Sequence, residues 1–164
     1  MEKKLVIKRT FALAFQNHQK NNLQVAENLY KEVLRLNPSH FEAIFFLGTL
    51  SAQSKKFDVA IQLLNKSIKI QPNYVHSHVN LGNTLKELRE HEKAISCYEK
   101  AIQINPNHAG AHYNLGIVFN ELGELQKAIS CYEKAIQINP NYVAAYNNLA
   151  NSFKELGKYK KTID

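Results

Sequence analysis

The sequence predicts an all-α solenoid of helix-turn-helix repeats, and three observations support this fold class. The segment from Ala94 to Asn107 recurs unchanged from Ala128 to Asn141, and this step of 34 residues is the length of one supersecondary unit. The four prolines fall at the same step, and small residues recur at fixed places in each period. With proline at position 32, the repeats are 7–40, 41–74, 75–108 and 109–142, followed by a partial repeat at 143–164.

Each repeat is expected to be a helical hairpin. Positions 8 and 20 are always small and have larger apolar residues at helical spacing around them, so two consecutive helices can approach closely. Position 8 is Ala14, Gly48, Gly82, Gly116 and Ala150, and position 20 is Ala26, Ala60, Ala94 and Ala128. Proline is unfavourable inside a helix, so the prolines end the second helix of each repeat. Gly123 and Gly157, at position 15, indicate the turn inside the hairpin.

These positions resemble the tetratricopeptide repeat, whose pattern has Leu at 7, Gly or Ala at 8, Ala at 20, an aromatic residue at 24 and Pro at 32. The resemblance extends from about Ile7 onward and is closest in 75–142. It implies a right-handed superhelical solenoid with a concave surface that binds a protein or peptide ligand. The sequence departs from the family at position 4, usually Trp, and at position 27. Position 4 is Thr10, Ile44, His78, His112 and Tyr146, and position 27 is Val33 and Ser67 in the first two repeats.

The charge distribution argues against a nucleic-acid partner. The net charge is +7, but residues 10–157 hold 14 basic and 12 acidic side chains, or +2, so +5 lies in the two ends. Only three residues are arginines, although readers of bases and phosphates favour arginine for its planar fork. We therefore expect one domain over 1–164 that binds no nucleic acid.

The compartment is expected to be the cytoplasm. The N-terminus has only three consecutive apolar residues, which is too few for a signal-peptide core or for membrane insertion. Cys97 and Cys131 occupy equivalent positions of adjacent repeats, too far apart for a disulfide, and free thiols suit a reducing compartment.

The family resemblance implies that positions 2, 5, 6, 9, 12 and 13 of each first helix line the concave surface. At the N-terminal end these positions include Phe11, Phe15, Phe45 and Phe46, which would form an apolar floor for an anchor from a partner. A second interpretation is open. Residues before Ile7, or a second copy of the chain, would cover this floor as a cap.

Asparagines recur further along the same surface. Position 6 is Asn80, Asn114 and Asn148, position 9 is Asn83, Ile117 and Asn151, and position 5 of the fourth repeat is Tyr113. An amide carries a donor and an acceptor, so such a ladder could bind the backbone of an extended peptide without reading its sequence. The solenoids of O-linked N-acetylglucosamine transferases are similar here. The alternative is that asparagine is a common, soluble filler at this position.

Other functions are not supported by the sequence. A clamp for acidic chaperone tails needs Lys at position 5, and no repeat has it. His78 and His112 are interpreted as flat fillers between helices and not as zinc ligands, because the spacing fits no usual metal site. No phosphate loop or catalytic motif is present, so neither an enzyme activity within this chain nor a cofactor is expected.

The partial repeat is expected to leave an uncovered end. It would expose Leu149, Phe153, Leu156 and Tyr159 on the side that a further helix would cover. The chain is therefore expected to be a fragment of a longer protein, and self-association through this end is a further expectation. Two functions remain open: a non-catalytic scaffold, or the substrate-docking arm of a longer enzyme such as an O-linked glycosyltransferase-like protein.

Overall fold

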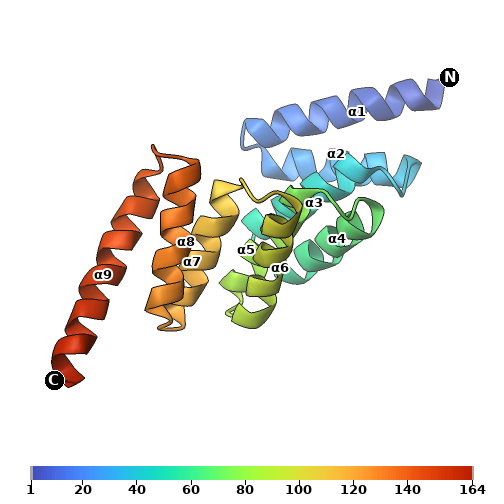
Figure 1. Cartoon of the computed structure of the whole chain (residues 1–164). Helices are drawn as coiled ribbons and strands as arrows, with labels where there is room; N and C mark the ends of the chain where they lie inside the picture. Colours follow the sequence, from blue (N-terminus) through green and yellow to red (C-terminus); the bar gives the residue numbers. More distant parts are fainter. Residues whose placement is uncertain (1, 164) are drawn as a thin grey trace. The chain divides into compact units, whose positions relative to one another are not determined.

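The computed structural model describes the backbone of residues 2–163 and the side chains of residues 2–157, and this part of the chain is all-α (Figure 1). The helices are α1 (Glu2–Gln19), α2 (Leu23–Leu36), α3 (Phe41–Gln53), α4 (Phe57–Ile70), α5 (Val75–Glu87), α6 (His91–Ile104), α7 (Ala109–Glu121), α8 (Leu125–Ile138) and α9 (Val143–Ile163). Helices α2, α4, α6 and α8 end just before the prolines, as predicted. The first helix begins at Glu2, earlier than the predicted repeat start at residue 7. No proline or glycine interrupts residues 2–7, and Glu2 in the first turn is favourable for the helix dipole.

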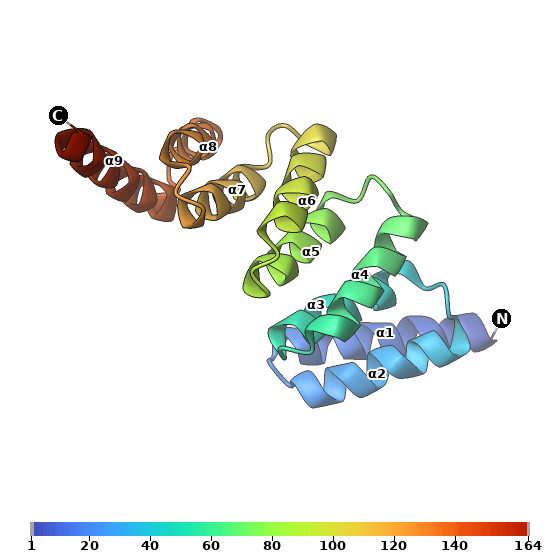
Figure 2. The same ribbon diagram turned by 90° about the horizontal axis from the view of Figure 1, so that it is seen from below.

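The contacts divide the chain into two compact units, Met1–Thr84 and Leu85–Asp164. In the first unit α1 packs on α2, α2 on α3 and α3 on α4, as Figure 1 shows. In the second unit α6 packs on α7, α7 on α8 and α8 on α9, which Figure 2 shows from another side. Each helix of these series contacts its neighbours along the chain, as expected for a solenoid. That the whole of 1–164 is one domain remains a prediction.

The small positions lie where the helices cross. All four alanines at position 20 are fully buried, and so are Tyr30, Leu64, Tyr98 and Tyr132 at position 24. A Cβ atom added to Gly116 would lie 2.6 Å from Cε1 of Tyr132, whereas one added to Gly48 would lie 3.1 Å from Cγ of Leu64. The prediction that position 8 is small because two helices approach closely is therefore confirmed in both repeats.

One backbone conformation forms the turn inside every complete repeat. Position 15 has a positive φ in each, with values of 60° at Asn21, 57° at Lys55, 58° at Arg89 and 75° at Gly123. The amide of position 16 donates to the carbonyl of position 11 over 2.8 to 2.9 Å, which is the hydrogen bond of a Schellman helix end. The turn predicted at Gly123 is confirmed, and three repeats make it without glycine.

Replacing Lys55 by glycine is expected to raise the free energy of unfolding by about 0.5 to 1 kcal/mol. The left-handed conformation is strained for a residue with a Cβ atom and unstrained for glycine, and this gain exceeds the added backbone entropy of the unfolded chain. Gly123→Ala is the reciprocal variant, since nothing lies within 4 Å of its added Cβ atom and the φ of 75° alone opposes it. Urea denaturation should move the two midpoints in opposite directions. A shift in the same direction would contradict the account of the turn.

The turn predicted at Gly157 is wrong, because α9 continues through this residue to Ile163. A turn here would leave a short second helix with little to pack against, whereas continuation keeps the backbone hydrogen bonds of one helix. Of the residues expected at the uncovered end, Phe153 is 51% exposed, while Leu149 and Leu156 are half-buried. The Tyr159 side chain lies outside the described residues.

The connections between repeats are built from asparagine, proline and histidine. At Asn37, Asn105 and Asn139 the side-chain oxygen accepts the amide of the residue two places further on, which makes a turn around the proline. His78 and His112 at position 4 hydrogen-bond through Nε2 to the carbonyls of Pro72 at 2.8 Å and Pro106 at 3.0 Å. These histidines therefore connect the first helix to the preceding loop.

In the first two repeats, which diverge from the family pattern, buried polar residues have polar partners. Ser67, where the family has alanine, lies 2.6 Å from Ser77 of α5, oxygen to oxygen, and both residues are fully buried. Glu27 of α2 accepts hydrogen bonds from Lys31 and Lys56, both at 2.7 Å, and the second of these joins the first repeat to the second. The lysine hydrogen bonds lower the pKa of Glu27 below its ordinary value of 4.5, although burial opposes the shift.

The described residues were compared with the requirements of a metal site and of a membrane-spanning helix. Among them, no three His, Cys, Asp or Glu side chains are grouped closely enough to hold a metal ion. No helix in the same part of the chain is long and apolar enough to cross a bilayer. Cys97 and Cys131 are free thiols, and burial raises the pKa of each to about 11, so the thiolate form is disfavoured at neutral pH.

Candidate functional site

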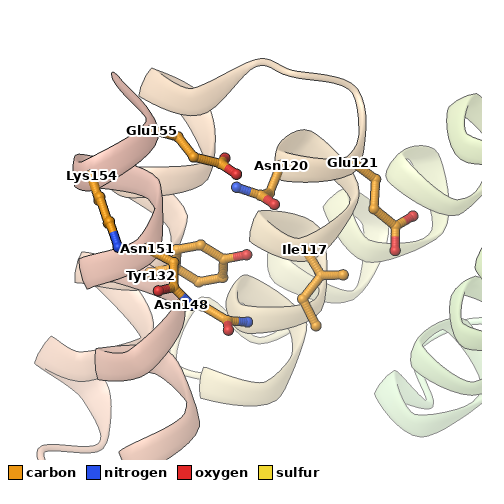
Figure 3. A pocket seen from close by; sticks show the side chains of 8 residues that line it. All are labelled: Ile117, Asn120, Glu121, Tyr132, Asn148, Asn151, Lys154 and Glu155. Carbon is orange, nitrogen blue, oxygen red and sulfur yellow. The ribbon is translucent and has the colours of Figure 1, made fainter. Parts of the chain in front are cut away.

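A polar pocket lies between the two first helices of the second unit, α7 and α9. We call it the asparagine pocket. Its volume is about 400 Å³. It is lined by Ile117, Asn120 and Glu121 from α7, Tyr132 from α8, and Asn148, Asn151, Lys154 and Glu155 from α9 (Figure 3). The pocket therefore brings together two predicted site residues, Asn148 and Asn151, with Ile117, which occupies position 9 of the preceding repeat.

The position-6 asparagines also connect neighbouring first helices. Asn148 donates from Nδ2 to the hydroxyl oxygen of Tyr113, at 3.2 Å. In the first unit, Asn80 donates in the same way to Oγ1 of Thr49, at 2.9 Å. One donor of each amide thus acts inside the solenoid, and the Asn148 side chain also hydrogen-bonds with Tyr132 of α8. Whether these amides also bind a peptide stays a prediction.

A second pair of side chains makes the same kind of connection at the other end of the pocket. Asn120 of α7 donates to Oγ of Ser152 at 3.1 Å. Ser152 in turn donates to the backbone carbonyl of Asn148 at 2.9 Å. The serine is fully buried, so this chain of hydrogen bonds fixes the spacing between α7 and α9. The pocket is preformed in the free chain, which reduces the ordering that ligand binding requires.

The accessible groups of the pocket are mixed in character. Asn151, Lys154 and Glu155 are exposed, and Ile117 is half-buried on the opposite wall. Figure 3 shows Asn148 and Ile117 facing each other across the pocket, with Asn120 and Glu155 directed toward each other at its rim. One apolar wall, one exposed and two half-buried amides, and charges of both signs suit a peptide backbone with varied side chains.

Burial determines the protonation of the tyrosine in the pocket. It raises the pKa of Tyr132 above its ordinary value, and the hydrogen bond with Asn148 opposes this only in part. The hydroxyl therefore stays protonated at neutral pH. At the rim, Oε2 of Glu121 lies 3.5 Å from Nδ1 of His91 on α6.

The four predicted phenylalanines lie together in the first unit. Ring centroids are 4.9 Å apart for Phe15 and Phe46, 5.1 Å for Phe45 and Phe46, and 6.4 Å for Phe11 and Phe15. We call these four residues the aromatic cluster. Phe45 is only 6% exposed and forms its base, while the other three are half-buried. Residues before Ile7 extend α1 along one side of the cluster.

The other predicted residues are placed as follows. Tyr113 stacks at a tilt on Tyr142, with ring centroids 4.8 Å apart, and accepts the bond from Asn148. Asn83 and Asn114 each take part in an interaction within the chain. Asn80 and Asn83 belong to the first unit, and Asn114, Asn148 and Asn151 belong to the second.

Sequence reasoning did not single out five lining residues of the asparagine pocket. Asn120, Glu121, Lys154 and Glu155 occupy positions 12 and 13, which the family pattern already assigned to the concave surface. That signal was available. Tyr132 stands at position 24, where the family pattern has an aromatic residue, and it is both fully buried and a wall of the pocket.

Comparison with known proteins gives one consistent family. Models described as tetratricopeptide repeats or TPR repeats match residues 19–75, 63–96, 82–123, 109–142 and 131–164. A search of the curated proteins gave no significant match.

Similar solved structures include a crystal structure of MamA protein, with 26% identity, a TM-score of 0.84 and coverage of 96% of this chain and 86% of that chain. A mutant Thermobaculum terrenum O-GlcNAc transferase shows 22% identity and a TM-score of 0.78, over 84% of this chain and 27% of that chain. A Pseudomonas aeruginosa pilF structure shows 19% identity and a TM-score of 0.86, over 97% of this chain and 72% of that chain. The last two similarities concern the fold alone.

Proposed function

Because this chain belongs to the tetratricopeptide-repeat family, a fold typical of protein-interaction scaffolds, we propose that it is a non-catalytic scaffold that binds an extended peptide along its first helices. The observation that supports this most strongly is the asparagine pocket. It joins two adjacent repeats, is preformed by internal hydrogen bonds and offers exposed amides beside an apolar wall. In this proposal the asparagine pocket binds the backbone of the peptide ligand.

The contacts of the pocket define how a peptide would be held. Asn151 is exposed, and its amide can donate to and accept from one peptide unit of an extended strand. The Asn148 carbonyl oxygen is a second acceptor one turn away. Ile117 would receive an apolar side chain of the ligand, while Lys154 and Glu155 accommodate either charge. Such contacts favour an extended backbone over a particular sequence.

The remaining predicted residues have assigned roles within the same proposal. In the first unit, the half-buried faces of Phe11, Phe15 and Phe46 receive an apolar anchor above the buried Phe45. Asn80 and Asn83 repeat the amide pattern there, and Asn114 does so in the second unit, where the Tyr113 hydroxyl accepts from Asn148. These roles follow from position and chemistry.

The test is the affinity of peptides selected by phage display against the full chain. We expect Asn151→Ala, combined with Asn148→Ala, to weaken binding about tenfold, equivalent to roughly 1.4 kcal/mol. The matched control is Asn65→Ala on α4, where the side chain is exposed on a second helix. Equal affinities for the double variant and the control would contradict the proposal. Circular dichroism checks that the double variant, which loses the Tyr113 bond, stays folded.

A second candidate function is the substrate-docking arm of a longer glycosyltransferase-like enzyme. The asparagines at position 6 favour it, together with the structural similarity to a segment of the O-GlcNAc transferase chain. The size of the native product in its source cell, detected with an antibody to this segment, separates the two. A mass near that of these 164 residues supports the scaffold, and a much larger mass supports the docking arm.

Self-association through α9 stays a prediction. Val143, Tyr146 and Phe153 are 69%, 47% and 51% exposed and lie on this one helix. Sedimentation of the full chain over a range of concentrations tests it, and Phe153→Ser should shift the distribution toward the monomer if α9 forms the contact.

A further inference from the structure

A second cavity lies in the first unit, between the start of α1 and the start of α3. Its volume is about 690 Å³, and three lysines of α1, Lys3, Lys4 and Lys8, belong to its lining. We call it the lysine pocket. Its remaining wall includes Ile7 and Phe11 of α1, His40 of the loop before α3, and Glu42 of α3. The volume is sufficient for a few side chains.

The apolar part of the lysine pocket is packed through the ring contacts of Phe11 with His40 and Tyr30. The Phe11 ring stacks on the His40 ring, with centroids 5.2 Å apart, and lies 6.0 Å from the fully buried ring of Tyr30. Ile7 lies one turn before Phe11, so the two present one apolar strip along the helix. This wall is formed by packed side chains of the chain itself, and it would take an apolar side chain.

The charge around the cavity is strongly positive. Lys3, Lys4 and Lys8 are exposed, and among the described residues none of them has a carboxylate within ion-pair distance. The one acidic group of the lining is Glu42, whose Oε2 lies 3.3 Å from Nδ1 of His40. The same nitrogen accepts a hydrogen bond from the Ala43 amide. Three ammonium groups therefore face one carboxylate.

From this combination we infer that the lysine pocket binds an acidic peptide segment that places one apolar side chain against Phe11 and Ile7, with flanking carboxylates on the lysines. The inference rests on the proposed function and adds the chemistry of the partner to it. Charge complementarity of this kind accelerates encounter and selects among partners.

Other occupants fit the lysine pocket less well. A second copy would present the exposed apolar end around Phe153, where the exposed Lys154 adds positive charge that repels the lysines of α1. A bilayer surface is flat and cannot place an apolar group deep in a cavity between two helices. A free peptide segment meets both the shape and the charge.

The experiment uses the full chain and three labelled synthetic peptides. The first has a phenylalanine flanked on each side by three acidic residues, the second has serine in place of the phenylalanine, and the third has glutamine and asparagine in place of the acids. Fluorescence anisotropy should give saturable binding of the first peptide and about tenfold weaker binding of the other two. Absence of saturable binding of the first peptide overturns the inference.

The variants separate a local site from general attraction by a basic protein. We expect Lys4→Glu with Lys8→Glu to weaken binding of the first peptide about tenfold, and the control pair Lys20→Glu with Lys69→Glu to change it less than about twofold. Both pairs change the net charge equally and alter exposed residues of the first unit. If both pairs of substitutions weaken binding of the first peptide equally, the inference that the lysine pocket is the binding site is overturned.

Two further arms distinguish the possible failures. Vesicles of phosphatidylserine and phosphatidylcholine that compete with the first peptide in a manner dependent on Lys4 and Lys8 would overturn a peptide ligand in favour of an anionic membrane. The Asn148→Ala and Asn151→Ala variant tests the proposed function separately with its own selected peptides. If that variant leaves the affinity for its selected peptides unchanged while the lysine variant weakens binding of the first peptide, the proposal for the asparagine pocket is contradicted and the inference for the lysine pocket is supported. If only the asparagine variant weakens binding, the inference for the lysine pocket is contradicted and the proposed function is supported.

Discussion

Gly116→Ala is expected to lower the free energy of unfolding by about 1 to 3 kcal/mol, although alanine is the better helix former. The added Cβ atom would lie 2.6 Å from Cε1 and 2.8 Å from Cδ1 of Tyr132, so the ring or the helix must move. The ring is fully buried and lies 5.9 Å from the Tyr113 ring, centroid to centroid, so it has little room. Urea denaturation of the full chain measures the effect.

Two glycine controls make this result specific. Gly48→Ala meets Leu64 at 3.1 Å, a softer contact, and should change stability by less than Gly116→Ala. Gly157→Ala lies within α9 with nothing within 4 Å, and should stabilise the chain by up to about 1 kcal/mol through helix propensity. In the first repeat, position 8 is alanine (Ala14) and position 24 is Tyr30. The Tyr30 hydroxyl there lies 3.3 Å from Nδ1 of His18, a contact particular to this repeat. If all three variants gave the same change, close helix approach at Gly116 would not be the reason for glycine.

The second large effect is expected at Glu27, where Glu27→Gln should lower the free energy of unfolding by about 1 to 2 kcal/mol at pH 7. The change keeps the size of the side chain and removes the charge that accepts from Lys31 and Lys56. The two lysine side chains are 60% and 47% exposed, so solvent screens the pairs and the effect is smaller than for a fully buried ion pair.

The effect of Glu27 should depend on pH in one direction. Because the pKa of Glu27 is lower in the folded chain than in the unfolded chain, its stabilisation is fully present above the unfolded value and is lost as pH falls through the folded value. The difference between the wild type and Glu27→Gln should therefore disappear in acid. Glu32→Gln, on the exposed side of the same helix, is the control. A difference that stayed constant from pH 7 into acid would contradict the charge-based account.

The period of the sequence predicted most of the fold because the same physical constraint recurs every 34 residues. Proline ends a helix wherever it stands, and alanine at position 20 is buried in every complete repeat. The turns at Lys55 and Arg89 carry no such signal, since both are charged residues in a conformation that glycine prefers. Gly157 shows the converse, because glycine permits a turn and does not require one.

The candidate site was predictable in part. The positions of Asn148 and Asn151 follow from the family pattern, but Tyr113, a partner of the Asn148 amide, lies one repeat away, and the bond depends on side-chain rotamers. The bond from Asn148 to Tyr113 and the chain through Ser152 could not be read from spacing. Glu27 was equally hidden, because the equivalent position is isoleucine in the other three complete repeats and only the contact with Lys56 explains a buried carboxylate.

The central claim is that a peptide binds in the asparagine pocket, and nuclear magnetic resonance tests it most directly. Peptides selected against the full chain would be titrated while the backbone amides and the asparagine side-chain amides are followed. We predict that the largest shifts occur at Asn148, Asn151 and their neighbours on α7 and α9, with the outward residues of α8 unaffected. Shifts confined to α8 or to another second helix would contradict the claim.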